Sequence, residues 1–196
     1  KLADISGWLD ERATFMGQWG LRGASGGPSY EEMVETEGRP RLRYWLDRLH
    51  TDSLVEPAVV YGYWPCHSEG NTLILGAPED PSREVTRFDF PRQTRDRRLC
   101  LADFFRDARE AADLGPDVIA LQLVTMGSVV AEATAKLFAA DAYRDYLELH
   151  GLSVQLTEAL AERWHDRVRC DLGFAADNGT IDEMIRHSVS PEIGGG

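Results

Sequence analysis

The chain has 196 residues, 43% of them hydrophobic and 28% charged, which is an ordinary soluble globular composition with enough residues to bury a core. Its formal net charge of -12 argues against a free-standing nucleic-acid-binding protein, because such proteins are usually basic. Three cysteines, Cys66, Cys100 and Cys170, lie far apart and are odd in number, which indicates free thiols rather than a disulfide scaffold. The sequence shows no secretory or long apolar segment. We therefore expect a cytoplasmic protein with no membrane partner, cut at Lys1 from a longer chain.

The first fifty residues predict helices. Residues 4–19 are typical of a short helical or irregular entry segment. Ser29 is predicted to cap the next helix, whose first turn carries Glu31 and Glu32. Residues 41–50 then predict a helix with one apolar face, which consists of Leu42, Trp45, Leu46 and Leu49.

Three strands are predicted next, over residues 58–64, 72–76 and 85–91. The first is rich in β-branched and aromatic residues, and we expect Pro65 to end it. Residues 68–71 and 77–82 are predicted as turns, and the third strand alternates as a half-buried strand does. Short turns between successive strands indicate an antiparallel meander.

The second half of the chain predicts a helix over residues 100–115, a buried strand over 117–125 and a helical segment from Ser128. The clearest helix is expected at residues 154–172. Its apolar stripe is Leu156, Ala159, Leu160, Trp164 and Val168, and its polar stripe is Glu158, Glu162, His165 and Arg169. The order of elements predicts an α+β fold, with helices packed on a mostly antiparallel sheet.

Short motifs do not decide the chemistry, because the sequence holds no complete nucleotide-binding, zinc-protease or serine-hydrolase signature. The glycine-rich residues 23–27 are interpreted as a flexible loop, since no strand precedes them. Cys-His-Ser-Glu at residues 66–69 favours a solvated hairpin turn over a metal site. His150, His165 and His187 are interpreted as surface or capping side chains.

Four arginines at residues 92, 95, 97 and 98 make one segment locally basic. They are suited to a phosphate or an acidic partner, but salt bridges to the surrounding carboxylates are favoured. Helical acids such as Glu158 and Glu162 also leave open an unrelated carboxylate-pair enzyme, although acids four residues apart on a helix are usually solvated.

Several dispersed stretches together resemble the activation domain of cobalamin-dependent methionine synthase, especially its actinobacterial forms. In chain order they are WLDERATFMGQWGLRG, EGRPRLRYWLDRL, AVVYGYWP, RFDFPRQ, CLADFF, QLVTMG, AYRDYLELHG and LTEALAERWHDRVR. The resemblance runs from about Ser6 to Arg186. It implies an activation-domain-like region over residues 1–186, followed by a flexible tail at residues 187–196.

The resemblance implies a bent, mostly antiparallel sheet with packed helices and a C-shaped outline. It also implies a module that binds S-adenosylmethionine and presents it as methyl donor for the reductive remethylation of cob(II)alamin. The implied partners are the cobalamin-binding module of the same enzyme and a flavodoxin-like or other reductase. This chain alone is expected to have no turnover, no catalytic residue and no metal site. The alternative is a docking module that has lost ligand binding.

Two ligand-binding residues follow from the resemblance. Asp10 matches the family's aspartate for the ligand's amino group, and Glu158 matches a helical glutamate near the site. By pattern alone, Asp10 is a helix cap or exposed acid and Glu158 a solvated side chain. The family's Arg-x-x-x-Gly-Tyr-Pro-x-Cys loop, whose arginine holds the ligand carboxylate, has no match here, and His187 stands where some relatives carry an acid. We therefore expect weakened binding.

Overall fold

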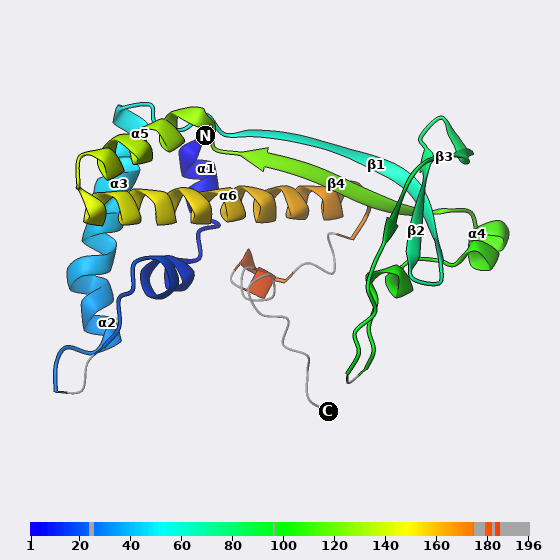
Figure 1. Cartoon of the computed structure of the whole chain (residues 1–196), viewed down its shortest axis with the longest axis horizontal. Coiled ribbons are helices and arrows are strands. Elements are labelled where there is room, and N and C mark those ends of the chain that lie inside the picture. The colour runs from blue at the N-terminus through cyan, green and yellow to red at the C-terminus, as the bar shows by residue number, and fades with distance from the viewer. Residues whose placement is uncertain (24–25, 96, 175–178, 182, 185–196) are drawn as a thin grey trace. The chain divides into compact units, whose positions relative to one another are not determined.

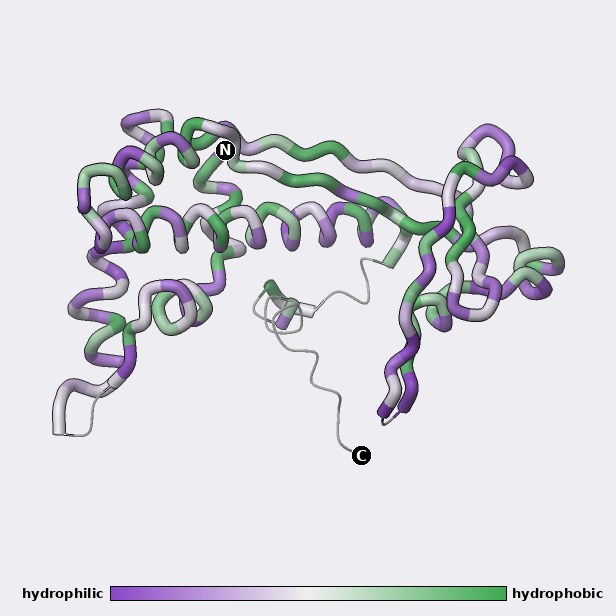
Figure 2. Tube along the Cα trace, viewed as in Figure 1, coloured by the Kyte–Doolittle hydropathy of each residue, from purple (hydrophilic) through white to green (hydrophobic). Residues whose placement is uncertain are grey.

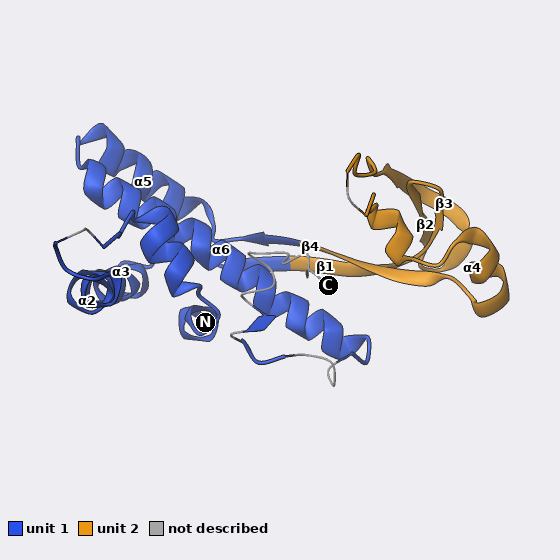
Figure 3. Ribbon diagram, turned by 90° about the horizontal axis from the view of Figure 1, so that it is seen from below, with its two compact units in different colours: residues 1–59, 123–196 blue, residues 60–122 orange. Residues whose placement is uncertain are grey.

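The computed structural model describes residues 1–23, 26–95, 97–174, 179–181 and 183–184, so the predicted tail at residues 187–196 lies outside the described residues. The chain divides into two compact units, coloured separately in Figure 3, and unit 2 (residues 60–122) is inserted in sequence within unit 1 (residues 1–59 and 123–196). The elements are α1 (Leu2–Ser6), η1 (Ala13–Gln18), α2 (Tyr30–Met33), η2 (Val34–Gly38), α3 (Arg39–Thr51), β1 (Ala58–Glu69), β2 (Thr72–Ala77), β3 (Asp80–Asp89), η3 (Leu101–Phe104), α4 (Ala108–Leu114), β4 (Asp117–Thr125), α5 (Ser128–Ala139) and α6 (Tyr143–Asp171).

The N-terminal helices of unit 1 form where the sequence predicts them (Figure 1). Ser29 caps α2 in a reciprocal capping box: its hydroxyl accepts from the Glu32 amide at 3.1 Å, and the Glu32 carboxylate accepts from the Ser29 amide at 2.8 Å. On α3, Leu42, Trp45 and Leu49 are buried, which confirms the predicted apolar face. The entry segment also includes η1, a single π-helical turn that buries Phe15.

Helix α6 is longer than the sequence predicts, since it begins at Tyr143 rather than at residue 154. Its alternating apolar and polar residues follow the helix along its length in Figure 2. Gly151 lies in the interior of this helix, where a glycine costs about 1 kcal/mol relative to alanine. Its role is tight packing: a Cβ at Gly151 would lie 2.7 Å from the Cβ of Gln18 in η1.

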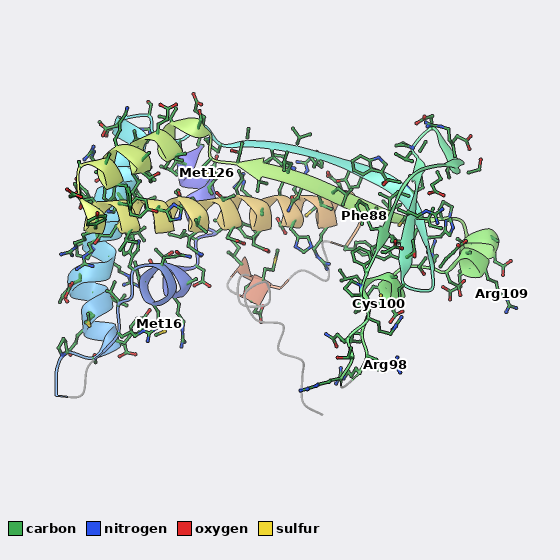
Figure 4. The ribbon with its side chains drawn as sticks, in the orientation of Figure 1. Met16, Phe88, Arg98, Cys100, Arg109 and Met126 are labelled. Atoms are coloured by element: carbon green, nitrogen blue, oxygen red, sulfur yellow. The ribbon has the colours of Figure 1, made fainter. Side chains whose placement is uncertain are left out.

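The core of unit 1 draws on both sequence halves of that unit. Met126, labelled at the end of β4 in Figure 4, is 4% exposed and belongs to this core. The stability of unit 1 therefore depends on apolar contacts between its two sequence segments, residues 1–59 and 123–196, which unit 2 separates along the chain. The buried members are Ile5, Trp8, Leu9, Phe15, Leu21, Leu42, Trp45, Leu49, Met126, Val130, Leu149, Leu152, Leu156, Ala159 and Leu160.

The four strands form one sheet in the order β3-β2-β1-β4. Strands β1 and β2 pair antiparallel from Cys66 opposite Leu75 to Glu69 opposite Thr72, so residues 70–71 make the hairpin turn. Strand β3 pairs antiparallel with β2, and the predicted meander and α+β class are both confirmed. A small core under this hairpin consists of Cys66, Leu73 and Leu75, with Trp64, Phe90, Phe105 and Ile119 packed against it.

Three predicted features of the strands are wrong. Pro65 does not end β1, which continues to Glu69; its register with β2 starts at Cys66, so no amide of Pro65 is needed in the β1–β2 pairing. The predicted turn at 77–82 is shorter, because β3 already begins at Asp80. Strand β3 is exposed along its whole length rather than half-buried, since it is the edge strand beside β2.

Two predictions for residues 100–125 are also corrected. The single helix expected over 100–115 is broken: η3 ends at Phe104, and α4 begins at Ala108. Asp107 causes the second start, because its carboxylate accepts from the amides of Arg109 and Glu110 at 2.9 and 2.8 Å. The strand at 117–125 is present as β4, but it is not buried; Leu123 is 75% exposed on this outermost strand.

The cysteines behave as free thiols in two different environments. Cys66 and Cys100 are buried, whereas Cys170 is exposed near the end of α6. Burial, with a smaller contribution from the Asp117 charge, raises the pKa of the Cys66 thiol to about 12.

We expect native protein to show one fast-reacting thiol, Cys170, and two that react only after unfolding, because the thiolate is the reactive form. The raised pKa also means that the Cys66 contribution to stability is present below the pKa of the unfolded thiol, about 8.5, and is lost as pH rises towards 12. Timed alkylation followed by mass spectrometry measures how fast each of the three thiols reacts. Rapid modification of Cys66 in folded protein at pH 8 would contradict the predicted difference in reactivity.

Candidate functional site

Asp10 lies in the short connection between α1 and η1, where both its side chain and its backbone carbonyl accept hydrogen bonds. One carboxylate oxygen, Oδ1, accepts from the amide of Ala13 at 2.8 Å, and the backbone carbonyl of Asp10 accepts from the Thr14 hydroxyl at 2.8 Å. This is the capping role that the residue pattern allows. The second oxygen, Oδ2, makes no hydrogen bond to any described residue, so capping leaves it available to a ligand.

An open hollow of about 1250 Å³ lies beside Asp10. Its wall residues come from the 6–12 segment and from η2 and α3, all within unit 1. Leu9, Leu42 and Leu46 contribute apolar side chains to its lining, and charged residues of both signs line it as well. Concave surfaces with an apolar floor and a few polar groups are the usual form of small-molecule sites.

The charged side chains that line this hollow differ in whether they form an ion pair within the protein. Arg39 is shared between Glu35 and, at 3.3 Å, Glu11. In contrast, Arg12 and Arg43 form no hydrogen bond or ion pair with any residue that the structure describes, and both are exposed. The hollow therefore combines the open oxygen of Asp10 with two guanidinium groups that are available for contacts.

Glu158 lies on α6, where it is exposed and makes no hydrogen bond or ion pair within the described ranges. Two contacts show which part of the chain α6 faces here. Gly151 packs on Gln18, and about three turns further along α6 the Arg163 guanidinium donates to the Asp4 carbonyl at 2.8 Å. Glu158 lies between Gly151 and Arg163 along α6, and Asp10 lies between Asp4 and Gln18 along the chain. No hydrogen bond or ion pair joins Asp10 and Glu158, both of which the structure describes.

Glu148 of unit 1 was not predicted, although its carboxylate has three side-chain partners. The residue is 7% exposed, and its carboxylate accepts from Trp45 Nε1 at 2.9 Å and from Arg144 Nε at 3.0 Å. Arg41 approaches the same carboxylate at 3.4 Å, and the Glu148 backbone carbonyl accepts from Trp19 Nε1 at 3.0 Å. The residue that caps the end of η1 and side chains of α3 and α6 thus converge on Glu148. Little in the sequence pointed to Glu148, because the residue lies in the part of α6 before residue 154, which was not predicted as part of this helix.

The other candidates have structural explanations. Residues 66–69 belong to β1, with Cys66 and Ser68 buried, so the predicted solvated turn is wrong for them and lies at residues 70–71. In the described part of the chain, no group of three His, Cys, Asp or Glu residues is arranged to hold a metal ion. The Nδ1 atom of His165 lies 3.8 Å from Oε2 of Glu162, which belongs to the same polar stripe of α6.

The basic segment forms salt bridges, at least at Arg92. Its guanidinium donates twice to Asp103, with both distances at 2.6 Å, which confirms the favoured interpretation for this residue. Arg98 projects from the loop that follows β3, and Arg109 projects from α4 (Figure 4). Of the glycine-rich residues 23–27, residues 24–25 lie outside the described residues, and so does His187.

Comparison with known proteins identifies the family. A family model described as "Vitamin B12 dependent methionine synthase, activation domain" matches residues 1–190. The chain belongs to this family. Methionine synthase of Mycobacterium tuberculosis (strain ATCC 25618 / H37Rv) is 58% identical to the activation domain over 187 residues, and that of Mycobacterium leprae (strain TN) is 55% identical over 181. These alignments cover 93% and 90% of this chain but only 16% and 15% of the two relatives.

The fold agrees with the family. The structure described as "Crystal Structure of the MetH Reactivation Domain bound to AdoHcy" is similar to this activation domain with a TM-score of 0.79 and 22% sequence identity. The similarity covers 96% of this chain and 59% of that chain. The family match over residues 1–190 and this shared fold together confirm the predicted resemblance. Within the described residues, no helix is long and apolar enough to span a lipid bilayer.

Proposed function

We propose that this activation domain binds S-adenosylmethionine and presents its methyl group to a cobalamin carried by another module of a methionine synthase. The observation that carries the proposal is the family match over residues 1–190. The similar solved reactivation domain, which is bound to AdoHcy, supports the ligand class. A reductase of the flavodoxin type or another reductase would supply the electron. The sequence is a fraction of its relatives' length, so these partners are part of the proposal.

The roles of this chain's residues are binding and orientation. Asp10 would accept from the ligand ammonium through Oδ2, while Oδ1 stays on the Ala13 amide and fixes the carboxylate's direction. Glu158, without another partner in the described chain, would place a negative charge near the sulfonium. Cobalamin on its own module would supply the methyl acceptor. Holding donor and acceptor in a fixed geometry is where such a module contributes to the rate.

Titration calorimetry with S-adenosylmethionine and S-adenosylhomocysteine tests the proposal. Asp10→Asn keeps an oxygen for the Ala13 amide but removes the charge, so we expect an unchanged fold and roughly tenfold weaker binding of both ligands. Glu158→Gln should weaken S-adenosylmethionine more than S-adenosylhomocysteine, because only the former carries the sulfonium charge. Asp47→Asn, an exposed acid of α3 outside the hollow, is the matched control.

The alternative is a docking module that has the same scaffold and has lost ligand binding. It predicts no heat with either ligand and yet a complex with an isolated cobalamin-binding module. Tight ligand binding that Asp10→Asn leaves unchanged would instead refute the site assignment while keeping the function.

A further inference from the structure

Three hydrogen bonds join Asp10 to the first two residues of η1. The Ala13 amide donates to Asp10 Oδ1 at 2.8 Å. The amide and the hydroxyl of Thr14 both donate to the Asp10 carbonyl, at 2.9 and 2.8 Å. Because Thr14 is buried, its own position is set by the packing of η1. The direction of the Asp10 carboxylate therefore depends on where η1 lies.

The other end of η1 is held against α6 at two points. Gln18, the last residue of η1, packs so closely on Gly151 that a Cβ there would lie 2.7 Å from the Gln18 Cβ. Trp19, the next residue, donates from Nε1 to the Glu148 carbonyl at 3.0 Å. Glu148 and Gly151 are about one turn apart on the same face of α6, so the two contacts together fix the end of η1.

Between these ends η1 is short and closely packed. The Trp19 amide closes its π turn on the Thr14 carbonyl at 2.9 Å. The buried Phe15 ring lies 5.5 Å from the Trp19 ring, measured between centroids. Single π-helical turns of this kind are frequent at functional sites. Because a close-packed element transmits displacement, a shift imposed at Gln18 is passed on to Asp10.

We propose that Gly151 of α6 is a positioning residue for the ligand contact of Asp10. Without a side chain at Gly151, η1 lies close to α6 and holds the Asp10 carboxylate in the direction that the ligand ammonium requires. Trp19 supports the same placement through its hydrogen bond to α6. Neither Gly151 nor Trp19 lines the hollow beside Asp10, so both act through η1. This inference rests on the proposed function, because it concerns the same ligand contact.

An added methyl group at Gly151 would move η1 and not α6. Helix α6 has 29 residues packed along the unit 1 core, whereas η1 has six, and the Gln18 Cβ is attached directly to the η1 backbone. The movement reaches the Ala13 amide and so turns the Asp10 carboxylate. A charge-assisted hydrogen bond weakens when its distance and angle change. Alanine is also a better helix former than glycine, so α6 itself is not weakened.

Titration calorimetry of S-adenosylmethionine on the 196-residue chain tests this inference as a double-mutant cycle. We expect Gly151→Ala to weaken binding about tenfold, but by less than about twofold once Asp10→Asn has removed the carboxylate charge. Adding Gln18→Gly to Gly151→Ala removes the colliding Cβ and should restore most of the affinity. Trp19→Phe keeps an aromatic ring but loses the donor to the Glu148 carbonyl, so about threefold weaker binding is expected.

Gly17→Ala is the matched control, since it adds the same methyl group where a Cβ meets nothing within 4 Å, and it should bind as the wild type does. Hydrogen–deuterium exchange without ligand gives a second readout. Gly151→Ala should speed exchange at the Ala13 amide, and adding Gln18→Gly should reverse that change. Unchanged exchange at Ala13 would contradict the inference.

The calorimetric outcomes separate this inference from the proposed function. If Gly151→Ala binds S-adenosylmethionine as the wild type does while Asp10→Asn does not, the inference is wrong and the proposed function stands. The same holds if Gly151→Ala weakens binding equally with and without Asp10→Asn, because its effect would then not pass through that carboxylate. If the wild type does not bind S-adenosylmethionine, both are overturned.

Discussion

Replacing Glu148 with alanine is expected to lower the free energy of unfolding by about 3 kcal/mol. The buried Nε1 of Trp45 would lose its acceptor, and Arg41 and Arg144 would lose their common carboxylate. The removed side chain would also leave space between α3 and α6. The two arginines are partly exposed and can return to water, so most of the loss comes from the tryptophan N–H and the cavity.

Thermal unfolding followed by circular dichroism measures this effect, which corresponds to a midpoint roughly 6–12 °C lower for a chain of this size. Glu148→Gln keeps an oxygen for Trp45 and should cost only about 1 kcal/mol. Glu132→Ala, an exposed acid on α5, is the matched control and should change stability by less than about 0.5 kcal/mol. Equal midpoints for Glu148→Ala and Glu132→Ala would show that the cluster does not stabilise the fold.

Gly76→Ala should destabilise unit 2 by about 3 kcal/mol, although it adds a single methyl group. Gly76 lies at the irregular register between β2 and β3, and a Cβ there would be 2.3 Å from the backbone carbonyl oxygen of Pro81. Neither partner can rotate away, because both are backbone. The turn between the two strands would have to move, and with it the pairing of Ala77 with Asp80.

Hydrogen–deuterium exchange at the β2 amides reports this change directly, and about 100-fold faster exchange is expected from local opening. Gly17→Ala is the control, since a Cβ at Gly17 meets nothing within 4 Å. It should leave exchange in both units unchanged. Slow exchange at Leu73 and Leu75 in Gly76→Ala would mean that the hairpin accommodates the methyl group.

Local signals in the sequence predicted local structure well. The predicted Ser29 cap needs only a side chain next to the first turn, and the stripe from Leu156 to Val168 needs only helical spacing. Both features depend on neighbours within one or two turns. The α+β class followed because strand and helix patterns are separated along the chain.

Features that depend on distant residues were missed or misplaced. Gly151, in the part of α6 that was not predicted, packs against Gln18, and Asp107 starts a helix inside what was predicted as a continuous one. Pro65 was predicted to end a strand, because the sequence of β1 alone does not show that its pairing with β2 begins only at Cys66. Tertiary contacts override each of these local preferences.

The site shows the same division. Asp10 and Glu158 came from the family resemblance, and their binding roles are still predictions. The grouping of Arg12 and Arg43 with Asp10 in one hollow was not predictable, because residues 6–12 and α3 meet only in the folded unit. Glu148 was missed for a related reason, since its partners Trp19 and Trp45 lie 129 and 103 positions earlier in the chain.

Those separations have a consequence for the order of events during synthesis. Trp19 and Trp45 leave the ribosome long before Glu148, and the whole of unit 2 is made in between. The contacts of β1, β2 and β3 are local, so the hairpins can form as soon as they emerge. The N-terminal helices must instead keep their indole groups hydrated until α6 arrives, and only then does unit 1 acquire a closed core.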